Sequence, residues 1–398
     1  MVQIFSFFIL FFMSKIPFEK RGRLSKLLNK SPMRKFLTIR HDFTFEVGMT
    51  SKERVRMAFE HREPDRIPLW YGASQALTEK LCAVTVSIDE EALMRRLHID
   101  FRRVRQDYIG PPLPVYEDGR NVNFWGVLRG GMEYGQPLTH PLAGAETVDD
   151  LLRYPWPDPV CFTSKNCRAQ CEQWSEYAII GGPWVVVWTD SSELMGMEEY
   201  LVKMVTHPEV IHALNQRVAD FYWDLCLEFF ENCGDLLDIF FFGDDFGTQE
   251  ALFISPAMWR EFFKPILKRF SDLGHDYGMK TMFHSCGSVW SIIPDLIDIG
   301  MDAVNPVQPR PKGMDLARLK RDYGSRITFH GALDHQKVLP FGTVDEVRAE
   351  VRRVIDIMAP GGGFCLAPSH DLMLADFPPE NVIAMYDEAE KYGRYNKG

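Results

Sequence analysis

Short apolar runs alternate with segments of helical periodicity between residues 66 and 392. Each run is long enough for a buried strand, and in the stretch after it apolar residues recur at helical spacing. Eight such pairs in succession are typical of parallel β/α units and predict an α/β fold, a (β/α)8 or TIM barrel. The predicted strands are Arg66–Gly72, Asp100–Val104, Tyr177–Trp188, Asp238–Gly243, Lys280–Phe283, Asp302–Pro306, Arg326–Gly331 and Gly363–Ala367.

One long segment interrupts this alternation after the second predicted strand. Pro111–Tyr154 carries many glycines and aromatic residues, and the prolines of Tyr154–Asp158 (YPWPD) disfavour regular structure. A loop of this length in a compact domain is more often functional than incidental. We therefore expect a single domain with a long insertion after strand 2, which is a candidate lid.

The first 48 residues differ from the rest of the chain. Ile4–Met13 is an apolar run that is too short to span a bilayer, and it lacks the preceding positive charge of a secretory signal. Thr50 and Glu53 then have the spacing of a helix capping box. We expect residues 49–398 to form the folded domain and residues 1–48 to be a disordered extension or a mis-called start, with a weak membrane anchor as the alternative.

Composition restricts the class of protein. The chain has 398 residues, of which 46% are hydrophobic and 25% charged, as in ordinary soluble globular proteins. Its formal net charge of −10 argues against a nucleic-acid surface, which would need a basic stripe. The eight cysteines are irregularly spaced and do not resemble a disulfide framework. We therefore expect a cytoplasmic protein without a nucleic-acid or membrane partner.

A candidate metal site follows the fifth predicted strand. His284 and Cys286 are two residues apart, so on an extended segment their side chains leave the same face. Cys365, at the end of another apolar run, could add a second sulfur. A His/Cys/Cys set with an open position is the arrangement of a catalytic zinc. The alternative is a packed histidine and two inert buried thiols.

Further candidate catalytic residues follow other predicted strands, on the face where barrel enzymes assemble their sites. Asp244 and Asp245 come directly after the fourth strand. One of them could be a fourth zinc ligand or a proton carrier, and the alternative is a pair that caps the next helix. His370 follows the eighth strand and is a candidate catalytic residue, or a hydrogen-bonding residue at the rim.

Four other residues are candidates for cofactor binding. Asn305 and Gln308 follow the sixth predicted strand at the same face. Trp184 and Trp188 lie in the third apolar run. They could face a flat macrocycle, although aromatic residues on a barrel strand more often belong to the core.

Several segments together resemble the uroporphyrinogen decarboxylase superfamily over most of residues 49–392. They are TSKERVRMAFEHREPDRIPL, YPWPD, GDDFGTQEALFISPAMWREFFKPILK, FHSCGSVWSIIPDLIDIGMDAVNPVQP, GALDHQKVLPFGTVDEVRAEV and FPPENVIAMYDEA. The chain is more similar to the corrinoid-linked branch, such as methylcobamide:coenzyme M methyltransferase, than to the decarboxylases. The decarboxylases have substrate-binding arginines where this chain reads WYGASQAL, and they lack its His-x-Cys motif.

This resemblance implies a function and a set of ligands. The related methyltransferases bind zinc through His-x-Cys and a later cysteine, which corresponds to His284, Cys286 and Cys365. The implied activity is methyl transfer between a corrinoid (cobalamin) and a thiol or a methoxylated compound. No Asp-x-His-x-x-Gly motif is present, so the methyl-corrinoid would belong to a separate protein. His370 resembles the histidine of the decarboxylase Gly-His-Gly motif, without the flanking glycines.

Two alternatives to methyl transfer stay open on the sequence. A metal-free tetrapyrrole decarboxylase would need cationic residues in the mouth of the barrel, and Arg102 and Arg103 are the candidates. A non-catalytic protein that only docks a corrinoid protein is the other alternative.

Overall fold

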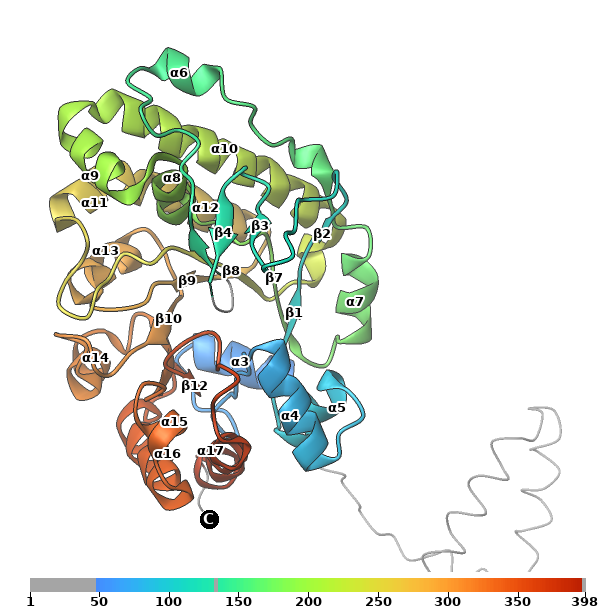
Figure 1. Ribbon diagram of the computed structural model, residues 1–398. Helices are drawn as coiled ribbons and strands as arrows, with labels where there is room; N and C mark the ends of the chain where they lie inside the picture. Colours follow the sequence, from blue (N-terminus) through green and yellow to red (C-terminus); the bar gives the residue numbers. More distant parts are fainter. Residues whose placement is uncertain (1–47, 132–134, 396–398) are drawn as a thin grey trace, which may run out of the picture. The chain divides into compact units, whose positions relative to one another are not determined.

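Seven parallel strands form the central sheet of the computed structural model, which describes residues 48–131 and 135–395. Each strand pairs with the next one of the sheet along the chain, the sheet is curled, and helices surround it (Figure 1). This succession of parallel strands confirms the predicted α/β class. In order the strands are β1 (Phe101–Val104), β7 (Ala178–Gly181), β8 (Ile239–Gly243), β9 (Lys280–His284), β10 (Ala303–Val307), β11 (Thr328–Leu333) and β12 (Phe364–Pro368).

The predicted first strand is not a strand of this sheet. Only Leu69 forms a parallel bridge, to Leu366 of β12, and its carbonyl accepts a hydrogen bond of 2.9 Å from the Asp100 N–H. Pro68 has no N–H to donate, which prevents a continuous ladder through this segment. The structure therefore confirms a curled sheet of seven parallel strands, and the complete eight-stranded barrel is not confirmed.

The third predicted strand is shorter than expected. β7 ends at Gly181, and Gly182 and Pro183 then turn the chain, with Gly182 at a φ of +114° that favours glycine. The last two residues of the apolar run, Val187 and Trp188, begin the helix α8 (Val187–Met195). Trp188 therefore lies on a helix and not on a strand.

Several helices begin at a residue whose side chain caps them. In α3, the Thr50 hydroxyl accepts from the Glu53 N–H and the Glu53 carboxylate accepts from the Thr50 N–H, which is the predicted capping box. No helix of the described ranges is both long and apolar enough to cross a membrane. Besides α8, the α-helices of residues 48–131 and 135–395 are α3 (Ser51–Phe59), α4 (Gln75–Thr85), α5 (Glu90–Arg96), α6 (Val148–Leu152), α7 (Cys167–Gln173), α9 (Met197–Thr206), α10 (Pro208–Cys233), α11 (Pro256–Phe262), α12 (Lys264–Asp276), α13 (Ile293–Asp298), α14 (Leu316–Tyr323), α15 (Val338–Phe341), α16 (Val344–Met358) and α17 (Pro379–Tyr392).

Two small antiparallel sheets lie in the segment between β1 and β7. One pairs β2 (Asp107–Tyr108) with β6 (Phe162–Thr163), and the other joins β3 (Asn121–Val122), β4 (Leu128–Gly130) and β5 (Gln136–Pro137). Trp125 of this segment is buried and its ring lies 4.7 Å from that of Phe221 on α10. Tyr154–Asp158 is irregular, as its prolines predict. The role of a lid stays a prediction.

Met49–Gly398 forms one compact unit, whose interior contains an apolar cluster. Alternate side chains of the strands enter this cluster, among them those of Phe241, Met282 and Cys365, and α3 packs against it. The predicted state of residues 1–48 lies outside the described residues, apart from Gly48, and the domain boundary stays a prediction.

Candidate metal centre

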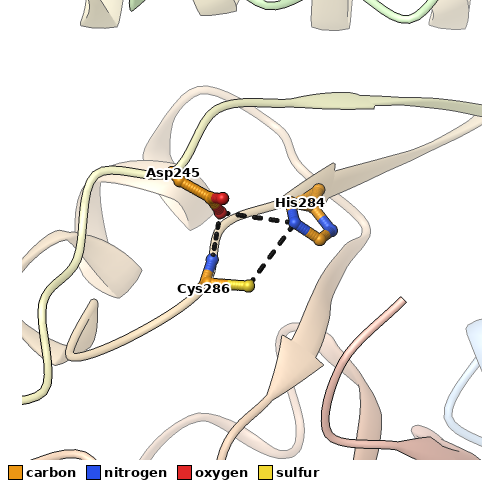
Figure 2. Close-up of side chains that lie close together, drawn as sticks. All are labelled: Asp245, His284 and Cys286. Atoms are coloured by element: carbon orange, nitrogen blue, oxygen red, sulfur yellow. Dashed lines mark hydrogen bonds and ion pairs between the residues drawn. The ribbon is translucent and has the colours of Figure 1, made fainter. Parts of the chain in front are cut away.

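Asp245, His284 and Cys286 converge at the carboxyl ends of two neighbouring strands. β8 and β9 pair with Gly243 opposite His284, so the loops that follow the two strands are adjacent. The His284 Nε2 lies 3.7 Å from the Cys286 Sγ and 3.3 Å from the Asp245 Oδ1 (Figure 2). The Cys286 N–H donates to the same carboxylate oxygen over 2.8 Å. All three potential ligand atoms lie within 4.8 Å of one another.

These distances fit a zinc ion. With zinc bonds of about 2.0–2.3 Å, a tetrahedral site separates a nitrogen and a sulfur ligand by about 3.6 Å, and a nitrogen and an oxygen ligand by about 3.4 Å. The observed separations, 3.7 and 3.3 Å, agree with both values. Imidazole, thiolate and carboxylate are all zinc ligands, and three of them leave one position for a substrate.

A chain of hydrogen bonds fixes the His284 ring. Its Nδ1 lies 2.7 Å from the Asn305 Oδ1, and the Asn305 Nδ2 lies 2.7 Å from the Nδ1 of His330. Burial lowers the pKa of His330 to about 4, so this ring is neutral and its Nδ1 accepts from the amide. The amide oxygen therefore accepts the proton on the His284 Nδ1, and Nε2 is the nitrogen that could bind a metal.

The charges around the group suit a cation. Burial acts to lower the pKa of His284, but Cys286 and Asp245 raise it well above its usual value. Burial acts to raise the pKa of Asp245, but hydrogen bonding to His284 and the charge of that ring hold it well below its usual range. Burial raises the pKa of Cys286. A metal would take the place of the imidazole proton, so its binding should release protons.

Replacing Asn305 by alanine should weaken zinc binding by roughly ten- to a hundredfold, because the orienting partner of His284 is lost. Zinc affinity is measured by competition with a chelator. Asn305→Asp is the matched control, because its carboxylate still accepts from the His284 Nδ1, and it should bind zinc within a few-fold of the wild type. An alanine variant that binds zinc as tightly as the wild type would contradict the orienting role.

Cys365, predicted as the third ligand, is not part of this group, and Asp245 is found in its place. Cys365 is the second residue of β12, three residues before the end of that strand, whereas His284 is the last residue of β9. In the register of the sheet, Cys365 lies opposite His330 of β11. The thiol is fully buried in the apolar interior cluster, which raises its pKa well above the usual value. The structure does not bring the predicted His/Cys/Cys set together, and that ligand set stays a prediction.

Asp244 caps a helix. Its two carboxylate oxygens accept from the Trp188 and Thr189 N–H groups, over 2.8 and 2.9 Å, at the start of α8. Burial raises its pKa to about 7. Trp188 is buried and its ring packs 5.4 Å from that of Tyr200. For Asp244 and Trp188, these contacts favour the structural alternatives that the sequence left open.

The remaining predicted residues lie around the centre. The Trp184 ring lies 5.3 Å from the His284 ring, and Gln308 accepts from the Gly287 N–H over 3.0 Å, which fixes the loop after Cys286. His370 lines the same cleft as His284, and its Nδ1 accepts from the Leu372 N–H over 3.1 Å. No contact of His370 with the three grouped side chains is found among the described residues.

The metal centre lies where two cavities meet. One has a volume of 610 Å³ and the other of 920 Å³. Both are lined by Asp245, His284, Trp184 and Asp190. Two reactants could therefore approach the same group from different sides.

Asp190 was not predicted individually, although it belongs to a polar cluster after the third apolar run. Burial raises its pKa to about 8, and the Tyr222 hydroxyl donates to its Oδ2 over 2.5 Å. The sequence could not reveal this environment, because Tyr222 lies on α10, far along the chain. At neutral pH Asp190 holds a proton in the wall of both cavities.

Replacing Asp190 by asparagine should flatten the pH dependence of stability. A carboxyl whose pKa is raised on folding stabilises the fold at low pH, and this stabilisation is lost as the pH rises from about 4 to about 8. The slope from one such group is at most about 1.4 kcal/mol per pH unit. Urea unfolding at several pH values measures it, and equal slopes in both proteins would contradict the assignment.

Comparisons with known proteins identify similar chains. A family model described as uroporphyrinogen decarboxylase (URO-D) matches residues 150–392. The methylcobamide:CoM methyltransferase MtaA of Methanosarcina barkeri is 29% identical over 143 residues, 35% of this chain and 38% of that protein. The MtaA of strain Fusaro is 28% identical over 143 residues, with the same shares of both chains. The matched segment thus spans well under half of these relatives.

A solved structure of a methyltransferase from Methanosarcina mazei shares the fold. The two structures have a TM-score of 0.57 and 20% sequence identity, and the match covers 86% of this chain and 99% of the other. At this level of identity the likeness bears on the fold.

Proposed function

This chain belongs to the uroporphyrinogen decarboxylase (URO-D) family, and from that premise we propose that it is a zinc-dependent methyltransferase. The methyl group would move between a corrinoid carried by a separate protein and a small thiol or methoxylated substrate. The relatives of known name, both methylcobamide:CoM methyltransferases, support this branch of the family. The observation that carries the proposal is the group of Asp245, His284 and Cys286, whose spacing fits zinc.

Asp245, His284 and Cys286 would hold the zinc ion, and each would contribute to the reaction in a different way. Bound zinc lowers the pKa of a coordinated thiol, so a substrate sulfur is present as thiolate at neutral pH. Cys286 and Asp245 contribute negative charge, which keeps such a sulfur electron-rich. His284 is oriented through Asn305 and exposes its Nε2 to the same point. Trp184 lies beside the His284 ring and lines both cavities.

Methyl transfer to a thiolate balances without an added oxidant or reductant. The sulfur attacks the methyl carbon of the methyl-corrinoid, a sulfur–carbon bond forms, and the cobalt–carbon bond breaks. The bonding electron pair stays on cobalt as cobalt(I). In the opposite direction, cobalt(I) would accept the methyl group of a methoxylated compound, and the leaving oxygen would take a proton. The cavities on two sides of the centre suit two separate reactants.

The decarboxylase alternative has less support from the geometry. Arg102, one of its two predicted cations, donates to Glu91 over 2.7 and 3.0 Å, and its guanidinium lies 3.7 Å from the Tyr177 ring. Arg102 does not line the cleft around the metal centre, whereas Arg103 does.

Metal analysis and a corrinoid assay test the proposal together. The purified protein should contain about one zinc per chain. Added methylcobalamin should be converted to cobalt(I), followed by its absorption spectrum, when a suitable member of a panel of thiols is present. Methoxylated aromatics with cobalt(I) test the opposite direction. A protein without zinc, and without activity in either direction, would contradict the proposal.

A further inference from the structure

The smaller of the two cavities beside the metal centre has aromatic walls. Phe124 and Trp125 from the segment between β1 and β7 line it, together with Phe162 of β6, Trp184 and Tyr222 of α10. The Phe124 ring lies 5.2 Å from the Phe162 ring, edge to face, and 5.2 Å from the Trp125 ring. Phe124, Phe162 and Trp184 are only half-buried. A cavity of 610 Å³ with this lining suits a planar aromatic ring.

Asp190 is a buried acid in this wall. In residues 48–131 and 135–395 its carboxyl has no ion pair, and its one side-chain hydrogen bond comes from the Tyr222 hydroxyl, 2.5 Å from Oδ2. Burial raises the pKa of Asp190 to about 8, and the neighbouring carboxyl groups of Glu193 and Asp244 act in the same direction. Because Tyr222 donates to Oδ2, the proton of Asp190 resides on Oδ1, where it can be donated to a bound molecule.

Two donors are available to the carboxylate that remains when this proton leaves. The Tyr222 hydroxyl already donates to Asp190. The Trp125 indole N–H is buried beside both groups and has no acceptor among residues 48–131 and 135–395. A carboxylate attracts such donors more strongly than a neutral carboxyl does. The surroundings of Asp190 therefore hold its proton at neutral pH and also suit the charge left after proton transfer.

Asp190 faces the same space as the metal centre. Together with Asp245 and His284, it lines both cavities. Asp244, next to Asp245 in the chain, accepts from two N–H groups in the first turn of α8, the helix that carries Asp190. The start of α8 is thereby fixed to the loop that carries Asp245. A molecule in the smaller cavity can thus present one atom both to Asp190 and to the metal centre.

We infer that the smaller cavity binds a methoxylated aromatic ring and that Asp190 donates a proton to the oxygen that leaves. The aromatic walls hold the ring, and its methoxy group lies between Asp190 and the metal centre. This inference rests on the proposed function for the methyl acceptor, which is the cobalt(I) corrinoid of the partner protein. It names aryl methyl ethers as the substrate class of this cavity.

The proposed step balances in atoms and electrons. A cobalt–carbon bond forms to the methyl group, and cobalt(I) becomes methyl-cobalt(III). The carbon–oxygen bond of the ether breaks, and its electron pair stays on oxygen. The proton passes from the Asp190 Oδ1 to this oxygen, so a phenol leaves. Asp190 remains as a carboxylate that accepts from Tyr222, and a proton from water restores the acid.

The dependence of the rate on the leaving group tests the proton donor. Ring-substituted methoxybenzenes whose phenols differ in pKa are assayed with cobalt(I) cobalamin and the full-length protein. The wild-type rate should depend weakly on the phenol pKa. In Asp190→Asn the rate should fall roughly a hundredfold or more for the poorest leaving groups, and much less for the best. Asp345→Asn, 93% exposed on α16, is the matched control and should behave as the wild type.

Tyr222→Phe is a second variant, in case Asp190→Asn folds poorly. It keeps the ring and removes only the hydroxyl that donates to Asp190. The dependence on the phenol pKa should steepen here too, by a smaller factor. Zinc content should equal that of the wild type in both variants. A loss of rate that is the same for every leaving group would overturn the role of Asp190 as proton donor.

Calorimetric titration tests the aromatic walls without turnover. The purified protein is titrated with 2-methoxyphenol. Phe124→Leu and Phe162→Leu should each weaken binding by roughly three- to tenfold, because ring contacts are lost. Phe341→Leu, at a residue that is 79% exposed on α15, is the matched control and should bind as the wild type. Affinity unchanged in both cavity variants would overturn the ring site.

The two assays also separate this inference from the proposed function. Zinc and methyl transfer to a thiol, without turnover of any methoxylated aromatic, would leave the proposed function standing and overturn the inference. A protein without zinc and without methyl transfer in either direction would overturn the proposed function and the proton step with it. Weaker binding of 2-methoxyphenol to the phenylalanine variants would still support the ring site in that case.

Discussion

Replacing Cys286 by alanine is expected to remove zinc from the protein and to abolish methyl transfer to thiols. The substitution takes away the sulfur ligand of a three-residue group whose other atoms lie 3.3 Å apart. Loss of a ligand should exceed the effect of losing an orienting partner, so zinc affinity should fall by more than about a hundredfold. Metal content of the purified variant and turnover of methylcobalamin measure the two effects.

Cys365→Ala is the control for this substitution. The Cys365 thiol is fully buried in the interior cluster and is not part of the metal group. The variant should retain zinc and activity, and its free energy of unfolding should fall by about 1 kcal/mol through the small cavity that forms. Loss of zinc from Cys365→Ala as complete as from Cys286→Ala would show that the two cysteines share an ion, as the sequence predicted.

Asp100→Ala should produce the largest loss of stability, about 3–5 kcal/mol in the free energy of unfolding. Asp100 is fully buried just before β1. Its carboxylate accepts from Arg54 over 2.7 Å, from Arg66 over 2.7 and 3.0 Å, and from the Leu69 N–H over 2.8 Å. Without it, two largely buried guanidinium groups each lose a charged acceptor, and the buried Leu69 N–H loses the carboxylate that accepts from it. Urea unfolding of the wild type and the variant measures the difference.

Asp118→Ala is the matched control. This aspartate is 55% exposed and forms a surface ion pair with Arg120. The change there should stay within about 0.5 kcal/mol. An Asp100→Ala variant that loses less than about 1 kcal/mol would show that the carboxylate does not hold α3 and the segment around Leu69 to the sheet.

Much of the fold follows from local patterns in the sequence. The apolar runs from Asp238 onward correspond to β8 through β12, because a strand buried on both faces needs a continuous apolar run. The first predicted strand does not form, because Pro68 lacks the N–H that a continuous ladder needs. The third predicted strand is shorter than expected, because the chain turns at Gly182. The closing of a sheet depends on pairing between distant segments, which periodicity does not specify.

In the candidate site too, the features that depend on neighbouring residues could be predicted, and those that depend on distant segments could not. The spacing of His284 and Cys286 is local, so the convergence of their side chains could be predicted from alternation. The place of Cys365 depends on what its side chain packs against, and it lies in the interior cluster, opposite His330 of β11. Asn305 was expected near the site, but its link to His330 joins two strands and has no sequence signal. Likewise, the sequence FRRVR does not reveal which arginines face the cleft.

X-ray absorption at the zinc edge of the purified wild-type protein tests the central claim most directly. The account predicts one zinc per chain with a single sulfur neighbour at about 2.3 Å and nitrogen or oxygen atoms in the other positions. Two protein sulfurs on the ion, or a protein that holds no zinc at all, would contradict it.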